Sequence, residues 1–174
     1  MSNKNILIAY FSHAGNNYVG GSIVNLKIGN TEIVAKRIEQ LTGGDLFKID
    51  PIKKYSEDYD ACTKEAQEEL RVAARPEIIE YQNSLDRYKN IILAYPNWWG
   101  TLPMPVFTFL EKYDFTSKTI LPLCTHEGSG MGRSESDIQK VCQQSIIQKG
   151  LPIRGSNVNS ADKEIINWLK ALAK

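Results

Sequence analysis

The chain has 174 residues, of which 42% are hydrophobic and 24% are charged, a composition typical of a globular protein with one domain over residues 1–174. Its 21 basic and 20 acidic residues give a formal net charge of +1, and no long basic run occurs, so nucleic acid and anionic membrane surfaces are excluded as expected partners. No apolar run approaches the roughly 20 residues that a membrane span requires.

Apolar runs rich in β-branched residues predict the strands. They lie at residues 5–11, 45–50, 90–96, 119–124 and 151–156. The first, third and fourth runs are almost continuously apolar, which is typical of central parallel strands that are covered on both faces. We therefore expect these three strands to form the core of a sheet.

Helical periods of apolar residues lie between the predicted strands. The first period contains Val34, Ile38 and Leu41, and the second contains Tyr59, Cys62, Ala66 and Ala73. Further helices are predicted from Pro103 to Glu111, around Ile138 and Val141, and through Ile165, Leu169 and Leu172. Asn30 or Thr31 and Ser134 are suitable N-cap residues, and Gly43, Gly44 and Gly150 are expected to follow helix ends.

The alternation of strands and helices predicts an α/β fold, a three-layer α/β/α sandwich with a five-stranded parallel sheet and right-handed crossovers. In such folds ligands bind beyond the carboxyl ends of the strands, where the strand order reverses. For a strand order of 2-1-3-4-5, that place is formed by the loops after the first, third and fourth strands. These three loops are the candidate site.

The first loop, from Ser12 to Thr31, contains two Gly-Asn pairs, Gly15-Asn16 and Gly29-Asn30. Because a helix is predicted to begin at its end, backbone N–H groups with hydroxyl and amide side chains beside them could bind a phosphate. A glycine-rich strand-to-helix turn is also an ordinary way to reverse the chain. The loop is neither a Walker loop nor a G-x-G-x-x-G fingerprint.

The second loop, from Tyr95 to Pro105, contains the adjacent residues Trp98 and Trp99 beside Asn97 and Gly100. Sequence neighbours cannot both face one apolar side of a regular element, so at least one indole should meet something other than the core. A planar aromatic ligand could stack on it. Alternatively, one ring is buried while the other covers a loop or a subunit contact.

The third loop, from Thr125 to Ser136, has glycines at positions 128, 130 and 132. Their pattern indicates close backbone approach to a ligand or, alternatively, a flexible surface loop. The chain has only two histidines, His13 and His126, and both fall in the candidate loops, although without a third ligand they disfavour a metal site. Cys62, Cys124 and Cys142 are widely spaced, which fits reduced, buried thiols in the cytoplasm.

The motifs "YFSHAG", "GNTEIVAKRI", "YPNWWGTLPMPVFTFLE" and "CTHEGSGMG" together resemble those of the flavodoxin family over essentially the whole chain. The resemblance implies a site for flavin mononucleotide (FMN) in which Ser12, Ala14, Asn30 and Thr31 hold the phosphate. It places at the cofactor Ser12, His13, Ala14, Gly15, Asn16, Asn30, Thr31, Pro96, Asn97, Trp98, Trp99, Gly100, Thr125, His126, Glu127, Gly128, Ser129 and Gly130. The insert between the two Gly-Asn pairs, residues 17–28, resembles a split phosphate loop and leaves open whether Asn16 or Asn30 contacts phosphate.

Electron-carrier flavodoxins are strongly acidic, whereas this chain has a net charge of +1, so steering toward a basic partner would be weak. The resemblance and the charge together favour an FMN-dependent oxidoreductase that reduces small molecules such as quinones, with electrons from a nicotinamide or another flavoprotein. His126 or Glu127 could relay the proton. The alternatives are an electron carrier to a redox partner protein and a non-redox module that binds a phosphorylated ligand. Exposed tryptophans and the insert could form the interface of a homodimer.

Overall fold

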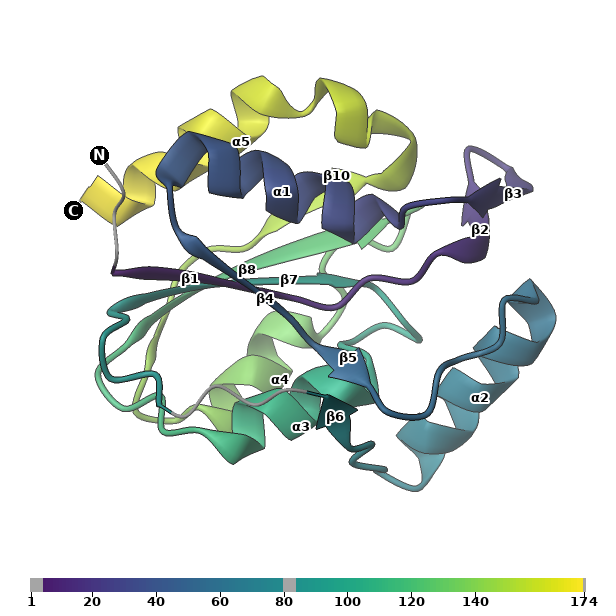
Figure 1. Cartoon of the computed structure of the whole chain (residues 1–174), viewed down its shortest axis with the longest axis horizontal. Helices are drawn as coiled ribbons and strands as arrows, with labels where there is room; N and C mark the ends of the chain where they lie inside the picture. The colour runs from purple at the N-terminus through teal and green to yellow at the C-terminus, as the bar shows by residue number, and fades with distance from the viewer. Residues whose placement is uncertain (1–4, 80–83, 174) are drawn as a thin grey trace.

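The apolar runs form one parallel sheet in the computed structural model of the chain, which describes residues 5–79 and 84–173 (Figure 1). Its main strands are β1 (Ile6–Tyr10), β4 (Asp45–Lys48), β7 (Asn90–Pro96), β8 (Thr119–His126) and β10 (Leu151–Arg154). They lie in the order β4-β1-β7-β8-β10, and each neighbouring pair is parallel. The expected order 2-1-3-4-5 is therefore confirmed.

The last edge of the sheet differs from the prediction. A short strand that the sequence did not predict, β9 (Ile146–Ile147), pairs with the start of β8, and β10 pairs with the end of β8. Gly150 therefore lies between two strands and does not follow a helix. The run predicted at 151–156 ends as a strand at Arg154, because the chain then turns into the 3-10 helix η1 (Gly155–Ser160).

Two groups of helices cover the two faces of the sheet (Figure 1). One face carries α1 (Asn30–Thr42), η1, α5 (Asp162–Leu169) and the 3-10 helix η2 (Lys170–Ala173), and the other carries α3 (Met104–Lys112) and α4 (Ser134–Val141). Along β1, Ile6, Ile8 and Tyr10 pack toward the first face, whereas Leu7 and Ala9 pack toward the second. Both faces of this strand are buried, which explains its unbroken apolar sequence.

The structure differs from the prediction at the end of the second helix and at the start of the fourth. The second helix, α2 (Tyr59–Arg71), ends before Ala73, which adopts a positive φ of 49° beyond its end. Asp58 caps this helix, because its side chain accepts a hydrogen bond from the Ala61 N–H. Ser134 is the first residue of α4 and not its N-cap, and its hydroxyl accepts a hydrogen bond from the buried Tyr95 side chain.

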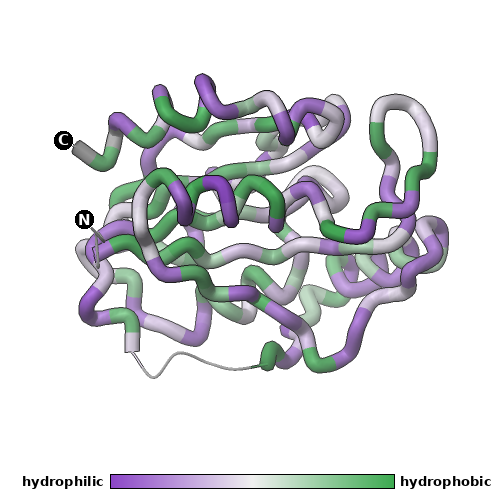
Figure 2. Tube along the Cα trace, turned by 45° about the horizontal axis from the view of Figure 1, so that its top comes forward, coloured by the Kyte–Doolittle hydropathy of each residue, from purple (hydrophilic) through white to green (hydrophobic). Residues whose placement is uncertain are grey.

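The insert of the first loop forms a β-hairpin. Strands β2 (Gly15–Val19) and β3 (Ser22–Leu26) are antiparallel, and Gly20 and Gly21 form the turn between them. Both glycines have positive φ, 60° and 99°, as a two-residue hairpin turn of type I′ requires. Figure 2 shows the hairpin standing out from the body of the molecule, with hydrophobic residues on both arms.

A second small antiparallel pair joins β5 (Asp50–Pro51) to β6 (Ile78–Ile79), on either side of α2 in the chain. This pair brings the two ends of the α2 segment together at one side of the sheet (Figure 1). Within the described residues, no helix combines the length and apolar character needed to span a membrane.

Candidate functional site

A cavity of about 540 Å³ lies beyond the carboxyl ends of β1, β7 and β8, where the three candidate loops meet. The predicted residues that line it are Ser12, His13, Asn16, Asn30, Thr31, Pro96, Asn97, Trp98, Trp99, Thr125, His126, Glu127, Gly128 and Ser129. Ala14, Gly15, Gly100 and Gly130 are not among its lining residues. The fold thus brings segments from the whole length of the chain to one place.

Three segments supply lining residues that were not predicted as parts of the site. The hairpin supplies Asn17 and Tyr18, α2 supplies Tyr59, Cys62, Thr63 and Ala66, and η1 supplies Gly155. The helical period through Tyr59, Cys62 and Ala66 was visible in the sequence, but a period shows only that a helix has an apolar face. It does not show whether that face covers the sheet or a cavity.

The N-terminus of α1 opens into the cavity. Gly29 occupies the N-cap position, where Asn30 or Thr31 was expected, and makes no side-chain cap. Ser12, at the other end of the split loop, caps the helix instead, because its Oγ accepts a hydrogen bond of 3.1 Å from the Glu32 N–H. A Cβ at Gly29 would lie 2.3 Å from that Oγ, so this close approach requires glycine.

The first-turn N–H groups of Asn30 and Thr31 remain available at this helix end. Neither makes a hydrogen bond within the described part of the chain. Both residues line the cavity. Asn16 lines it as well, but it lies in the hairpin, where its side chain accepts a hydrogen bond from Asn25. Unpaired backbone donors at a helix N-terminus attract anions, because the helix dipole and the N–H groups act in the same direction.

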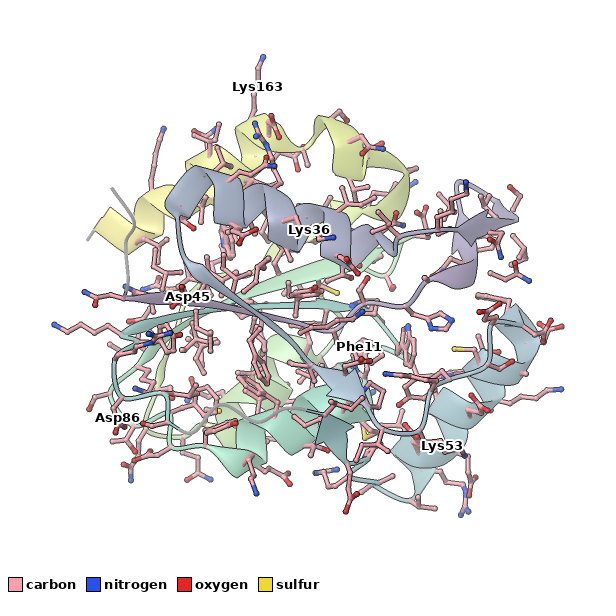
Figure 3. The ribbon with its side chains drawn as sticks, in the orientation of Figure 1. Phe11, Lys36, Asp45, Lys53, Asp86 and Lys163 are labelled. Carbon is pink, nitrogen blue, oxygen red and sulfur yellow. The ribbon has the colours of Figure 1, made fainter. Side chains whose placement is uncertain are left out.

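The two adjacent tryptophans have different environments, as their adjacency in sequence predicted. Trp98 packs edge-on against Phe11 and Tyr55, with ring centroids 5.1 and 4.9 Å away. Phe11, the first of these partners, lies inside the molecule (Figure 3). Trp99 is 46% exposed, has a φ of 54° and donates a hydrogen bond from Nε1 to the Thr63 carbonyl of α2. One indole therefore anchors the second loop to the core, and the other attaches it to α2.

Asn97 joins the second loop to the third. Its side-chain amide donates to the Gly130 carbonyl and accepts from the Gly100 N–H, and both bonds are 2.9 Å long. Its own backbone N–H donates to the Thr125 carbonyl. Gly100 and Gly130 thus contribute to the site through Asn97, which explains why they support the cavity wall without lining it.

Glu127 joins the third loop to two other segments. Its carboxylate accepts one hydrogen bond from the Gly20 N–H at the hairpin turn and another from the Ser156 N–H of η1. The neighbouring His126 accepts a hydrogen bond through Nδ1 from the Gly128 N–H, and burial together with Arg154 lowers the pKa of its imidazole. The two side chains that we expected to relay a proton are both engaged with the backbone.

His13 lines the cavity with an imidazole that lies beside Trp98 and Tyr55 and is edge-on to both rings. Its Nε2 is buried and makes no hydrogen bond within the described residues. Burial lowers the pKa of the ring, against the opposing effects of Glu57, Glu65 and a hydrogen bond with the Ser56 backbone. A buried nitrogen without a partner is costly, so its position on a cavity wall points to a ligand contact.

The lining of the cavity combines polar groups with aromatic and aliphatic side chains and carries little charge. None of its lining residues is lysine or arginine. Cys62 lies in the α2 wall, where burial, together with Glu65 and Glu69, raises the pKa of its thiol to about 12, so the thiol remains protonated near neutral pH. All three cysteines are free and buried.

Comparison with known proteins places the chain in a family. Residues 5–172 match the family model described as Flavodoxin. A comparison with curated protein sequences found no match. Among solved structures, a Bacteroides eggerthii protein is 26% identical over 99% of both chains, with a TM-score of 0.78.

Two more distant structures share the fold. A flavoprotein in complex with FMN from Lactobacillus acidophilus is 18% identical over 95% of this chain and 98% of its own, with a TM-score of 0.64. Oxidised Flavodoxin 2 from Bacillus cereus is also 18% identical, over 96% of this chain and 99% of its own, with a TM-score of 0.51. With the family model matching nearly the whole sequence, the chain belongs to the flavodoxin family.

Proposed function

We propose that the protein binds FMN in the 540 Å³ cavity and uses it to reduce small molecules such as quinones. The observation that carries this proposal is the opening of the α1 N-terminus, with the unpaired N–H groups of Asn30 and Thr31, into a cavity walled by Trp98 and Trp99. A phosphate and a flat aromatic ring would thus find their binding groups in one continuous space.

The phosphate end of the cavity fits a dianion without a cationic side chain. Asn30 and Thr31 would donate backbone N–H groups, and the side chain of Asn30 faces the same cavity. Helix N-termini bind phosphate in this way because their unsatisfied donors and the positive end of the helix dipole converge. Ser12 would keep the loop in place through its bond to Glu32.

The ring end of the cavity has the size and the aromatic character of a cofactor site. Its volume of about 540 Å³ lies within the roughly 300–1,000 Å³ that is usual for small-molecule sites. Trp98 and Trp99 would flank the ring, and the backbone of Gly128 and Ser129 would lie near its edge. FMN would supply the redox chemistry, and this chain would position it and admit the acceptor.

Two comparisons support the choice of FMN. The Lactobacillus acidophilus flavoprotein was solved in complex with FMN, and the Bacteroides eggerthii protein carries a provisional assignment as a flavoprotein. The formal net charge of +1 favours a small acceptor over long-range steering to a basic partner. The hairpin also narrows the route by which a large partner could approach the cavity.

A second candidate function is electron transfer to a basic redox protein. Beside the cavity, the segment from residue 57 to residue 69 carries Glu57, Asp58, Asp60, Glu65, Glu68 and Glu69 and one lysine, Lys64. A local acidic surface can orient a basic partner even on a protein of balanced charge. Turnover separates the two functions, because a carrier needs an added reductase and an enzyme does not.

The test begins with the purified protein. We expect a flavin absorption spectrum, or submicromolar binding when the apoprotein is titrated with FMN, and weaker binding of riboflavin because it lacks the phosphate. Anaerobic addition of NADH or NADPH should bleach the flavin, and a quinone should restore its colour over many turnovers. An apoprotein that binds FMN no better than millimolar would contradict the proposal.

A further inference from the structure

We propose that His13 exchanges a proton with the small molecule that is reduced in the cavity. The inference rests on the proposed function and adds to it the residue that completes the reduction. Its starting point is the Nε2 atom of His13, which is buried at the cavity wall and has no hydrogen-bond partner within residues 5–79 and 84–173.

The surroundings of His13 hold its ring in place. Trp98 contacts the ring edge-on at a centroid distance of 5.9 Å and an interplanar angle of 75°, and Tyr55 does so at 6.5 Å and 88°. Asn17, in strand β2 of the hairpin, donates a side-chain hydrogen bond to the His13 carbonyl. Ring and backbone are thus both constrained, so the free nitrogen has a defined position at the cavity.

The other titratable side chains of the cavity are poor candidates for this role. The Glu127 carboxylate accepts two backbone hydrogen bonds, and His126 accepts one through Nδ1. Burial raises the pKa of the Cys62 thiol to about 12 and also raises the pKa of Tyr59. Tyr18 lies on the exposed hairpin, so solvent reaches its side chain. Among the described lining residues, His13 combines an imidazole with a buried ring nitrogen that has no hydrogen-bond partner.

The surroundings of His13 shift the pKa of its imidazole in opposite directions. Burial acts in one direction and lowers the pKa below 6.5. The carboxylates of Glu57, which precedes α2, and Glu65, which lies on α2, act in the other direction, together with the Ser56 backbone. The ring is therefore mostly neutral at neutral pH, and its protonated fraction grows as the pH falls.

The proposed step balances for a quinone acceptor. Reduction of a quinone to a hydroquinone consumes two electrons and two protons. Bound FMN, once reduced by a nicotinamide, would supply both electrons and one proton as a hydride. The second proton comes from His13: the Nε2–H bond breaks as an O–H bond forms on the acceptor oxygen, and the neutral imidazole then takes up a proton from water.

Two variants separate the chemistry of His13 from its packing. His13→Gln retains a polar group of similar reach that does not titrate, and His13→Phe retains an aromatic edge for Trp98 and Tyr55. We expect both to lower kcat for 1,4-benzoquinone by about 10²-fold or more, the usual scale of general acid catalysis, and to remove the decline of kcat at rising pH. Circular dichroism and FMN titration would check that both variants fold and bind.

Nuclear magnetic resonance gives a readout that does not depend on activity. The chain has two histidines, so the imidazole signal that is absent from His13→Gln identifies His13. We expect a pKa below 6.5 in the wild-type apoprotein, a lower value in Glu65→Gln, and a shifted Nε2 resonance when hydroquinone is added to the FMN-bound protein. Glu164→Gln, an exposed change on α5, is the matched control and should leave the His13 signal unchanged.

The outcomes distinguish the two proposals. Failure of the wild-type protein to bind FMN would overturn the proposed function, and the role of His13 with it. If wild type binds FMN and reduces benzoquinone, but both His13 variants keep its rate and pH profile, only the role of His13 is overturned. An Nε2 resonance that does not respond to hydroquinone would overturn it as well, without recourse to any variant.

Discussion

The hydroxyl groups of Thr31 and Thr125 lie 2.7 Å apart in the interior, although 94 positions separate the two residues in sequence. Thr31 is in the first turn of α1, and Thr125 is near the end of β8. Their hydrogen bond joins the helix end that opens into the cavity to the strand that carries the third loop. This pair of small side chains thus contributes to the relative position of these two parts of the cavity wall.

Removing one member of this pair should destabilise the protein. In Thr125→Val the buried Thr31 hydroxyl, which is 2% exposed, would lose its partner. We expect the free energy of unfolding to fall by about 1–3 kcal/mol, the cost of a buried polar group left unsatisfied. Urea denaturation of the apoprotein measures this change. The double variant Thr31→Val/Thr125→Val should recover part of the loss, and strictly additive losses would contradict the pairing.

Replacement of Glu127 should release the hairpin from the rest of the site. Glu127→Ala removes the acceptor of the Gly20 and Ser156 N–H groups. We expect faster hydrogen exchange at both amides, because their protection depends on this carboxylate, and Glu127→Gln should show a smaller effect because it keeps one oxygen acceptor. Unchanged exchange at Gly20 would show that the hairpin is held by other contacts.

Shortening the hairpin tests its role as a wall of the cavity. Replacing Tyr18 to Lys27 by a brief turn leaves Ser12 and the α1 N-terminus in place, so phosphate binding should survive. Access to the cavity should change, because Tyr18 is removed from its lining. Titration with FMN and KM values for a small and a bulky quinone measure the two effects. Loss of FMN binding would instead make the insert part of the phosphate site.

The two tryptophans should respond differently to truncation. Trp98 packs against Phe11 and Tyr55, so Trp98→Ala should lower the free energy of unfolding by about 2–4 kcal/mol. Trp99 is exposed and makes one side-chain hydrogen bond, so Trp99→Ala should cost about 1 kcal/mol or less. Under the proposed function, both should weaken FMN binding, which titration measures. If neither variant changes FMN affinity, the rings do not flank the cofactor.

His13 should make the apoprotein less stable in mild acid. Its pKa is lowered from 6.5 in the folded protein, so the unfolded chain binds more protons between the folded value and about 6.5. The free energy of unfolding therefore falls as the pH decreases through this window, and the contribution is constant above it. Urea denaturation at about pH 7.5 and about pH 5.5 should show a smaller decrease in His13→Gln than in wild type. An equal decrease would place the His13 pKa at its ordinary value.

Local sequence patterns were sufficient to predict the sheet and the edge at which the cavity lies. The nearly continuous apolar runs of β1, β7 and β8 identify strands covered on both faces, because period and composition are properties of a few consecutive residues. The loops that follow these strands could then be assigned to one edge, since parallel strands end together. For the same reason, most of the predicted residues line the cavity.

Other features depend on which distant groups approach each other. The sequence shows that Trp98 and Trp99 cannot share one environment, but only the packing decides that Trp98 contacts Phe11 and that Trp99 reaches Thr63. Asn97 and Glu127 were predicted at the cofactor, and both line the cavity while their side chains also join loops. The partners of a polar side chain depend on the whole fold, so its neighbours in sequence do not reveal them.

The sequence by itself determined that the two Gly-Asn pairs begin and end one loop between the first strand and the first helix. The tertiary structure decided that Gly29 caps this helix, that Ser12 closes the loop through Glu32, and that the insert becomes a hairpin. It also left Nε2 of His13 buried at the cavity wall without a hydrogen-bond partner among the described residues. Residue type and spacing are local, whereas burial and hydrogen-bond satisfaction arise only when remote segments pack together.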